Sequence, residues 1–263
     1  MSFKIQHIIP LLAVCLLTAC TAEENGQPST LRGSFTLGLS TDSLVVEVTT
    51  RAGRNLTDAE QQIFTVSLTQ NGEKIWENIP FADITQDDRI QPVGNGYVVS
   101  AESCTSSEAE SANNGWGQRR YWGQSDSFDI KSGENTEVSV DCHMANAGLC
   151  VEFDESFTSY FTMGYSVTTD DSRTLRFDNT TSGRVAYYNI PDGNTRVVHL
   201  LVNASAGWDG TLHIERDLVL TRGGVTRLHV RKSESTEGQI DLGITFDDEF
   251  DVRYEYIDVP LED

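Results

Sequence analysis

One pattern of residues occurs twice in this chain, and it constrains the fold more than any other feature of the sequence. The copies span residues 128–140 and 218–230, at a constant offset of 90 residues. In each copy an apolar strand pattern leads to a glycine, Gly133 or Gly223, and a threonine three residues later opens a second alternating pattern. Glycine tolerates the positive φ of a tight turn, and alternate apolar residues line one face of a strand. The repeat therefore predicts two similar β units in tandem.

Alternating apolar residues continue through most of the chain, beginning with Phe35, Leu37 and Leu39. Asn71-Gly72, between two such runs, is typical of a β-hairpin, and the nearby Trp76 is expected in the core. Residues 104–124 are predicted to form a long loop, and residues 57–60 and 155–161 to be briefly helical. Further strands are predicted at residues 64–68, 97–101, 164–168, 174–177, 184–188, 197–203, 211–220 and 225–230.

These patterns predict an all-β fold made of two tandem β-sandwich domains. The 263 residues are enough for two cores of modest size. We place the N-terminal sandwich at residues 33–142 and the C-terminal sandwich at residues 143–246, with a short connector at residues 143–148. Residues 247–263 are expected to form an acidic tail or a strand.

The start of the chain has a different character. Lys4 precedes an apolar run over residues 8–17, which Thr18, Ala19 and Cys20 close. This order resembles the bacterial lipoprotein signal, in which the cysteine is acylated and becomes the mature N-terminus. We predict a signal peptide over residues 1–19, lipidation at Cys20 and a flexible spacer over residues 20–32. An ordinary cleaved leader is the alternative; a membrane-spanning helix would need about 20 apolar residues.

The predicted location is the outer membrane, on its cell-surface face, with the acyl chains as the membrane contact. Glu23-Glu24 lies directly behind the acylated cysteine and resembles the acidic signal that sends some Bacteroidetes lipoproteins to the outer leaflet. The chain has 40 Asp and Glu against 19 Lys and Arg, a net charge of −21. Such a surface repels phosphate backbones, so we expect no nucleic-acid partner.

Beyond the leader and the acylated Cys20, three cysteines remain: Cys104, Cys142 and Cys150. An exported protein can form a disulfide, and we prefer Cys104 with Cys142 because both end predicted strands in the same half of the chain. Three unpaired buried thiols are the alternative.

The sequence offers little for catalysis. No His-Glu-x-x-His, Gly-x-Ser-x-Gly or phosphate-loop motif occurs, so no catalytic residue, cofactor or metal is expected. His199, His213 and His229 lie on three predicted strands, where ordinary strand histidines are the simpler interpretation. Asp247 to Asp251 lacks the order of a calcium loop.

The sharpest binding hypothesis concerns aromatic and arginine residues in the predicted loop. Flat rings stack on sugars, and guanidinium groups bond to hydroxyls or carboxylates. The alternative is structural, with one tryptophan folded over the sandwich edge. The candidate ligand contacts, for a glycan or a protein, are Trp116, Arg119, Arg120, Tyr121 and Trp122.

Several short motifs, taken in order, resemble a family of Bacteroidetes surface lipoproteins catalogued as a domain of unknown function. Beside the signal at Cys20 they are Val48-Thr-Thr-Arg51-Ala52, Tyr97-Val-Val-Ser-Ala-Glu102, Tyr121-x-Gly123, Gly133-x-x-Thr136, Cys142-x-x-Ala-Asn146 and Phe157-x-x-Tyr160-Phe161. The resemblance extends to the fimbrillins and other cell-adhesion lipoproteins. It implies a non-catalytic surface lipoprotein of adhesion or fimbria-like assembly, whose partners are other surface or fimbrial subunits, or glycans. A glycan-binding lipoprotein of a polysaccharide-uptake system is the alternative, and a hydrolase has the least support.

The same resemblance implies a processing step. Fimbrillins are cut after an arginine, which frees an early strand so that another subunit's strand can fill the groove. Arg51 is the candidate processing residue here, and the alternation of Phe250, Val252, Tyr254 and Tyr256 is a candidate donor. The simpler interpretation places Arg51 in a loop and makes the tail an edge strand.

Overall fold

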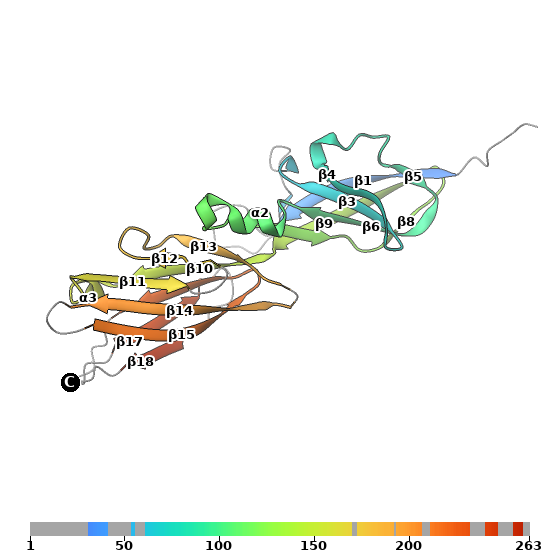
Figure 1. Ribbon diagram of the computed structural model, residues 1–263. Coiled ribbons are helices and arrows are strands. Elements are labelled where there is room, and N and C mark those ends of the chain that lie inside the picture. Colours follow the sequence, from blue (N-terminus) through green and yellow to red (C-terminus); the bar gives the residue numbers. More distant parts are fainter. Residues whose placement is uncertain are drawn as a thin grey trace, which may run out of the picture.

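The computed structural model describes residues 31–41, 54–55, 61–169, 173–191, 193–206, 211–231, 240–246 and 255–259, with backbone alone for 54–55, 240–246 and 255–259. Figure 1 shows the strands in two groups, with the short helix α2 (Ser106–Ser111) at the place where they meet. We call β1–β9 the N-terminal lobe and β10–β18 the C-terminal lobe. The all-β prediction is confirmed, while two tandem domains with the boundaries given above stay a prediction.

The N-terminal lobe is one nine-stranded sheet that follows the order β2-β1-β9-β7-β6-β3-β4, with β5 beside β1 and β8 beside β6. The sheet curls over on itself: Phe35 near one end stacks on Trp76 at the other, with ring centroids 5.8 Å apart. Its elements are β1 (Arg32–Thr41), β2 (Arg54–Asn55), β3 (Thr65–Gln70), β4 (Glu73–Pro80), η1 (Phe81–Asp83), β5 (Ile90–Pro92), β6 (Gly94–Glu102), η2 (Asn113–Gly115), β7 (Tyr121–Gln124), β8 (Phe128–Ile130) and β9 (Asn135–Met144).

The C-terminal lobe is a sandwich of two sheets. One has the order β13-β10-β16-β17-β18 and the other the order β12-β11-β14-β15. Its elements are β10 (Asn146–Phe153), α3 (Glu155–Thr158), β11 (Gly164–Thr169), β12 (Arg176–Phe177), β13 (Val185–Asn189), β14 (Thr195–Ser205), β15 (Thr211–Thr221), β16 (Val225–Val230), β17 (Ile240–Phe246) and β18 (Glu255–Val259).

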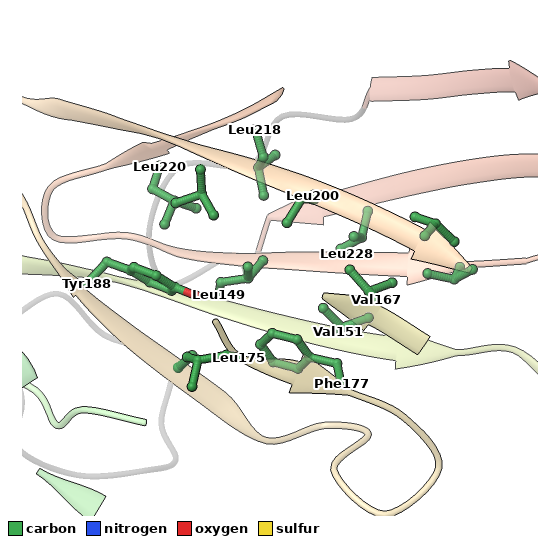
Figure 2. Packing of buried hydrophobic residues seen from close by; sticks show 14 of the residues in the cluster. Leu149, Val151, Val167, Leu175, Phe177, Tyr188, Leu200, Leu218, Leu220 and Leu228 are labelled. Carbon is green, nitrogen blue, oxygen red and sulfur yellow. The ribbon is translucent and has the colours of Figure 1, made fainter. Parts of the chain in front are cut away.

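The core of the C-terminal lobe lies between its two sheets (Figure 2). Leu149 and Val151 on β10 face Val167 on β11 and Leu200 on β14, and all four are buried. Each strand contributes alternate residues, as the period-2 pattern predicts. Burying one such side chain completely stabilises the fold by about 1.5–3 kcal/mol.

The predicted turns are present. Asn71 and Gly72 have φ of 51° and 87° and join β3 to β4 as an antiparallel hairpin, and Trp76 on β4 is 9% exposed. Gly133 and Gly223 have φ of 71° and 77°. The two glycines of the sequence repeat therefore make equivalent turns, which lead into β9 and β16.

In the structure, the repeat extends beyond residues 128–140 and 218–230 to one further strand in each lobe. β1 pairs in parallel with β9, and β10 pairs in parallel with β16. Ser34 on β1 is opposite Asn135, and Gly148 on β10 is opposite Val225. Because Asn135 and Val225 are equivalent positions of the repeat, β1 and β10 occupy equivalent places in the two lobes.

Only Ala145 separates β9 from β10, so the connector is shorter than the predicted 143–148. β10 is buried on both faces over its first six residues. Leu149 faces the C-terminal core, whereas Cys150 belongs to the buried cluster of the N-terminal lobe. The two apolar clusters therefore meet across one strand.

Candidate functional site

The segment between β6 and β7, predicted as a loop, contains α2 and contacts both lobes. Thr105 caps α2: its hydroxyl accepts a hydrogen bond from the Glu108 amide, and the Glu108 carboxylate accepts one from the Thr105 amide. This reciprocal cap satisfies two backbone donors that a helix start leaves open. The bonds from the Thr105 amide and hydroxyl hold the pKa of the Glu108 carboxyl below its usual value.

Trp116 packs against the C-terminal core instead of standing in solvent. Its ring meets Phe177 edge-on at 5.0 Å between centroids, and the Arg184 guanidinium lies 4.1 Å from its ring centroid. Its carbonyl accepts a hydrogen bond of 2.8 Å from the Tyr187 amide. Gly117, at φ +78°, permits this approach because a Cβ there would lie 2.6 Å from the Tyr187 carbonyl oxygen. Trp116 therefore fastens the segment to β13.

The next residues are bound to the connector. Arg120 donates its backbone amide to the Asn146 side-chain oxygen at 3.1 Å, and its carbonyl accepts from the Ala145 amide at 2.7 Å. The Arg120 guanidinium pairs with Glu102 at 2.8 Å, and both side chains are mostly buried. Arg119 donates from Nε to the Tyr187 hydroxyl at 3.0 Å. Both arginines are thus engaged in holding β6, β7, β10 and β13 together.

An ionic cluster completes this junction from the C-terminal side. Arg173 donates to the carbonyls of Glu110 and Tyr187, at 2.9 Å and 2.6 Å. The Glu110 carboxylate pairs with Arg196 at 2.8 Å and accepts a bond from the Asn189 amide group at 3.0 Å. These side chains are mostly buried. Breaking such a network leaves an uncompensated charge in a dry environment, which is strongly destabilising.

The predicted ligand cluster is therefore divided by the structure. Tyr121 and Trp122 are neighbours on β7, so their side chains point to opposite faces of the sheet: Tyr121 is 5% exposed and Trp122 is 40% exposed. Trp116, Arg119 and Arg120 make their contacts within the junction. Trp122 is the one member of the five that is presented to solvent.

Trp122 lines an open groove on the outer face of β7 and β9. Asp141 and His143 on β9 and Asp126 beyond β7 line it too, and Arg222 reaches it from the C-terminal lobe. Trp122 pairs across the sheet with His143 on one side and Glu102 on the other. The alternation of β7 was a usable signal for this exposure, whereas the approach of Arg222, 100 residues away, was not.

The disulfide prediction is wrong in this structure, where the three described cysteines, Cys104, Cys142 and Cys150, form no disulfide. Cys142 points into the N-terminal core, 3.9 Å from the Ala101 carbonyl oxygen, whereas Cys104 lies outside the sheet and accepts a contact from Gln118 at 3.5 Å. Burial, together with the nearby Asp141 charge, raises the pKa of the Cys142 thiol to about 12. Cys142 is therefore an inert core thiol.

The three strand histidines do not form one site. His199 and His213 both lie near Glu215, with Nε2 atoms 3.9 Å and 3.2 Å from its carboxylate oxygens, while His229 lies near Glu152. Within the residues that the structure describes, no group of three or more His, Cys, Asp and Glu side chains is arranged to hold a metal ion.

Several predictions lie outside the described residues: lipidation at Cys20, the leader, processing at Arg51, the helical turn at residues 57–60 and the run from Asp247 to Asp251. They stay predictions. In the described part of the chain no helix is long and apolar enough to cross a membrane.

The fold and junction define an all-β protein whose strands form two lobes with a packed connection between them. The chain belongs to the family described as "Domain of unknown function (DUF4493)", whose model matches residues 32–261. The family suggested by the short motifs is confirmed. A search of curated proteins finds no match.

Two solved structures are similar to this chain over most of its length. A fimbrial assembly protein from Parabacteroides distasonis has 12% sequence identity and a TM-score of 0.46, over 85% of this chain and 100% of that one. The fimbrial anchor protein Mfa2 from Porphyromonas gingivalis has 11% identity and a TM-score of 0.44, over 81% of this chain and 96% of that one.

Proposed function

We propose that this protein is a non-catalytic surface lipoprotein, anchored to the outer membrane through Cys20, that acts in cell adhesion or fimbria-like assembly by exchanging strands with other subunits. The observation that carries the proposal is the placement of β1. This strand begins the described fold, yet it lies inside its sheet, between β9 on one side and β2 and β5 on the other.

The side chains of β1 fill the N-terminal core. Phe35, Leu37 and Leu39 are 2%, 6% and 1% exposed. β1 reaches β3 only through residues 42–64, and Arg51 lies within that stretch. A cut after Arg51 would leave β1 held by backbone pairing and burial alone. Loss of the strand would open an apolar groove, and an alternating strand from another subunit has the pattern needed to fill it.

The C-terminal end of the chain offers a strand of the required kind. Within the described residues β18 is the last strand of its sheet, and its one pairing there is with β17, antiparallel, over Ile240–Ile244 and Glu255–Val259. An edge strand can leave with the loss of a single ladder of hydrogen bonds. The preceding residues carry the apolar alternation of Phe250 and Val252. β18 and the residues before it are therefore our candidate donor.

The test is to treat the purified chain with an arginine-specific protease and to separate the products on a native gel. Cleavage after Arg51 should give a ladder of oligomers, and a chain ending at Phe246, which lacks β18, should give none. Arg51→Lys should block both the cut and the ladder, whereas the matched control Arg54→Lys should permit both. A chain that is cut after Arg51 and stays monomeric would contradict strand exchange.

A second function, glycan binding, is favoured by one specific observation: the exposed ring of Trp122 in an open groove. A double change of Trp116 and Trp122 would not test it, because Trp116 packs against the C-terminal core. Trp122 alone has to be changed.

A further inference from the structure

The ring of Trp122 is unusual among the exposed side chains of this protein. It is 40% exposed, and it is the one aromatic residue among the large hydrophobic side chains that stand exposed in the described part of the chain. The others are aliphatic or, at Met163, a thioether. An exposed tryptophan leaves a large apolar surface in water, which a flat ligand can cover.

The surroundings of Trp122 leave room for such a ligand. The neighbouring strand β9 presents Ser139, Asp141 and His143 on the same outer face. One strand further, Gly38 on β1 lies opposite Ser139, and no atom lies within 4 Å of the position that a Cβ on Gly38 would take. At this position no side chain projects from the sheet surface, which leaves space for a ligand near the ring.

The groove also carries hydrogen-bonding groups of both kinds. Asp126 and Asp141 supply acceptors, and Asp141 already accepts a bond from the Ser40 hydroxyl, which orients it. Gln124 supplies a donor and an acceptor, and His143, which is opposite Trp122 on β9, also lines the groove. Such a mixed set suits sugar hydroxyls, which both donate and accept.

Arg222 bounds the groove on the side of the C-terminal lobe, and the turn between β13 and β14 holds its side chain in place. Its Nη2 donates to the carbonyls of Ile190 and Gly193, at 3.3 Å and 3.0 Å. The side chain is thus fixed where the two lobes meet, and the groove has a boundary on that side.

The charge of the groove and of the whole chain determines whether neutral or anionic sugars can bind. Two carboxylates and the guanidinium of Arg222 line the groove, and Arg222 is already bonded to backbone carbonyls. Because the whole chain carries a net charge of −21, we expect a uronate, sialylated or sulfated ligand to be repelled. We propose that the outer face of β7 and β9 binds neutral oligosaccharides, with the apolar face of one pyranose ring lying on Trp122 and its hydroxyls bonded to Asp141 and Gln124. The inference rests on the surface role proposed above and adds a ligand class to it.

The test is binding of the purified protein to immobilised neutral glucans, mannans and galactans, beside sulfated and uronate-containing polysaccharides. We expect binding to at least one neutral polysaccharide and none to the anionic ones. Trp122→Ala should weaken binding about tenfold or more, and Trp122→Phe, which keeps a ring, by less. Val197→Ala is the matched control, because Val197 is 56% exposed on the other lobe.

Each of these binding measurements can support or overturn the proposed glycan site. Absence of binding to every neutral polysaccharide, preference for an anionic one, or unchanged binding by Trp122→Ala would overturn the inference. Thermal melting of each variant separates lost binding from lost folding. Strand exchange is measured separately, so ladders without glycan binding would overturn this inference alone, and a monomeric cut chain that still binds glycans would overturn the assembly proposal alone.

Discussion

β1 and β10 occupy equivalent places in the two lobes, but they are attached to the chain in different ways. Each pairs in parallel with the strand that follows a repeated glycine turn. β1 stands at the start of the described fold, whereas β10 follows β9 after Ala145 and is buried on both faces. Under the proposed strand exchange, the equivalent strand is removable in one lobe, whereas in the other it is a fixed joint between the lobes.

The largest expected effect on stability comes from truncating a core side chain on either of these strands. Phe35→Ala and Leu149→Ala should each lower the free energy of unfolding by about 3–5 kcal/mol, because each leaves a cavity in a closed core. Since the apolar clusters meet across β10, we expect both variants to shift one common transition in urea, followed by tryptophan fluorescence. Two separate transitions, with each variant shifting only the transition of its own lobe, would contradict the prediction that the lobes unfold together.

Trp116→Ala should come next, at about 2–3 kcal/mol, because it removes a partly buried ring with its Phe177 and Arg184 contacts. It should also separate the unfolding of the lobes into two steps. Trp122→Ala, as a matched control, should stay within about 0.5 kcal/mol of the wild type. Equal effects of the two changes would contradict the division of the aromatic cluster.

The Cys142 thiol gives a pH-dependent effect specific to the N-terminal lobe. Its folded-state pKa is raised to about 12, so the folded protein keeps a proton that the unfolded chain loses above about pH 9. The stability that the buried thiol contributes to the fold is complete below about pH 9. It is lost as the pH rises towards 12, at roughly 1.4 kcal/mol for each pH unit.

Urea titrations at pH 8 and pH 10 measure this loss, and Cys142→Ala should show a smaller difference between the two. In native protein at pH 8, a thiol reagent should modify Cys104 well before Cys142. A disulfide between the two would leave neither thiol reactive, which would restore the pairing expected from the sequence.

The smallest effect is expected at the cap of α2. Thr105→Ala should cost about 1 kcal/mol, because the Glu108 amide loses its acceptor. Ser111→Ala, at the exposed end of the same helix, should change stability by less than about 0.5 kcal/mol. Urea denaturation of both variants checks this, and equal losses would show that the cap is not the cause.

The fold was predictable from the sequence where the signal is local. The alternation of Phe35, Leu37 and Leu39 marks β1, and Asn71-Gly72 marks the first hairpin, because strand period and positive φ depend on neighbouring residues. Thr105-x-x-Glu108 is an equally local capping signal for α2. Tyr121 and Trp122 stand in strand alternation, so both α2 and β7 were predictable within the segment assigned to a loop.

The rest of the site depends on contacts between residues far apart in the chain. Gly117 meets Tyr187, and Arg173 reaches Glu110, across 60 to 70 residues. No periodicity encodes such pairs. An aromatic and arginine-rich segment therefore has the same composition whether it binds a ligand or holds two lobes together.

The parallel pairing of β1 with β9 has a mechanical consequence. A pull between the start of β1 and the start of β10 acts on β1 at its first residue and on β9 at its last. In parallel strands these two ends lie at opposite ends of the ladder, so the load shears it. The hydrogen bonds from Ser34 to Thr41 then share the force together and cannot open one after another.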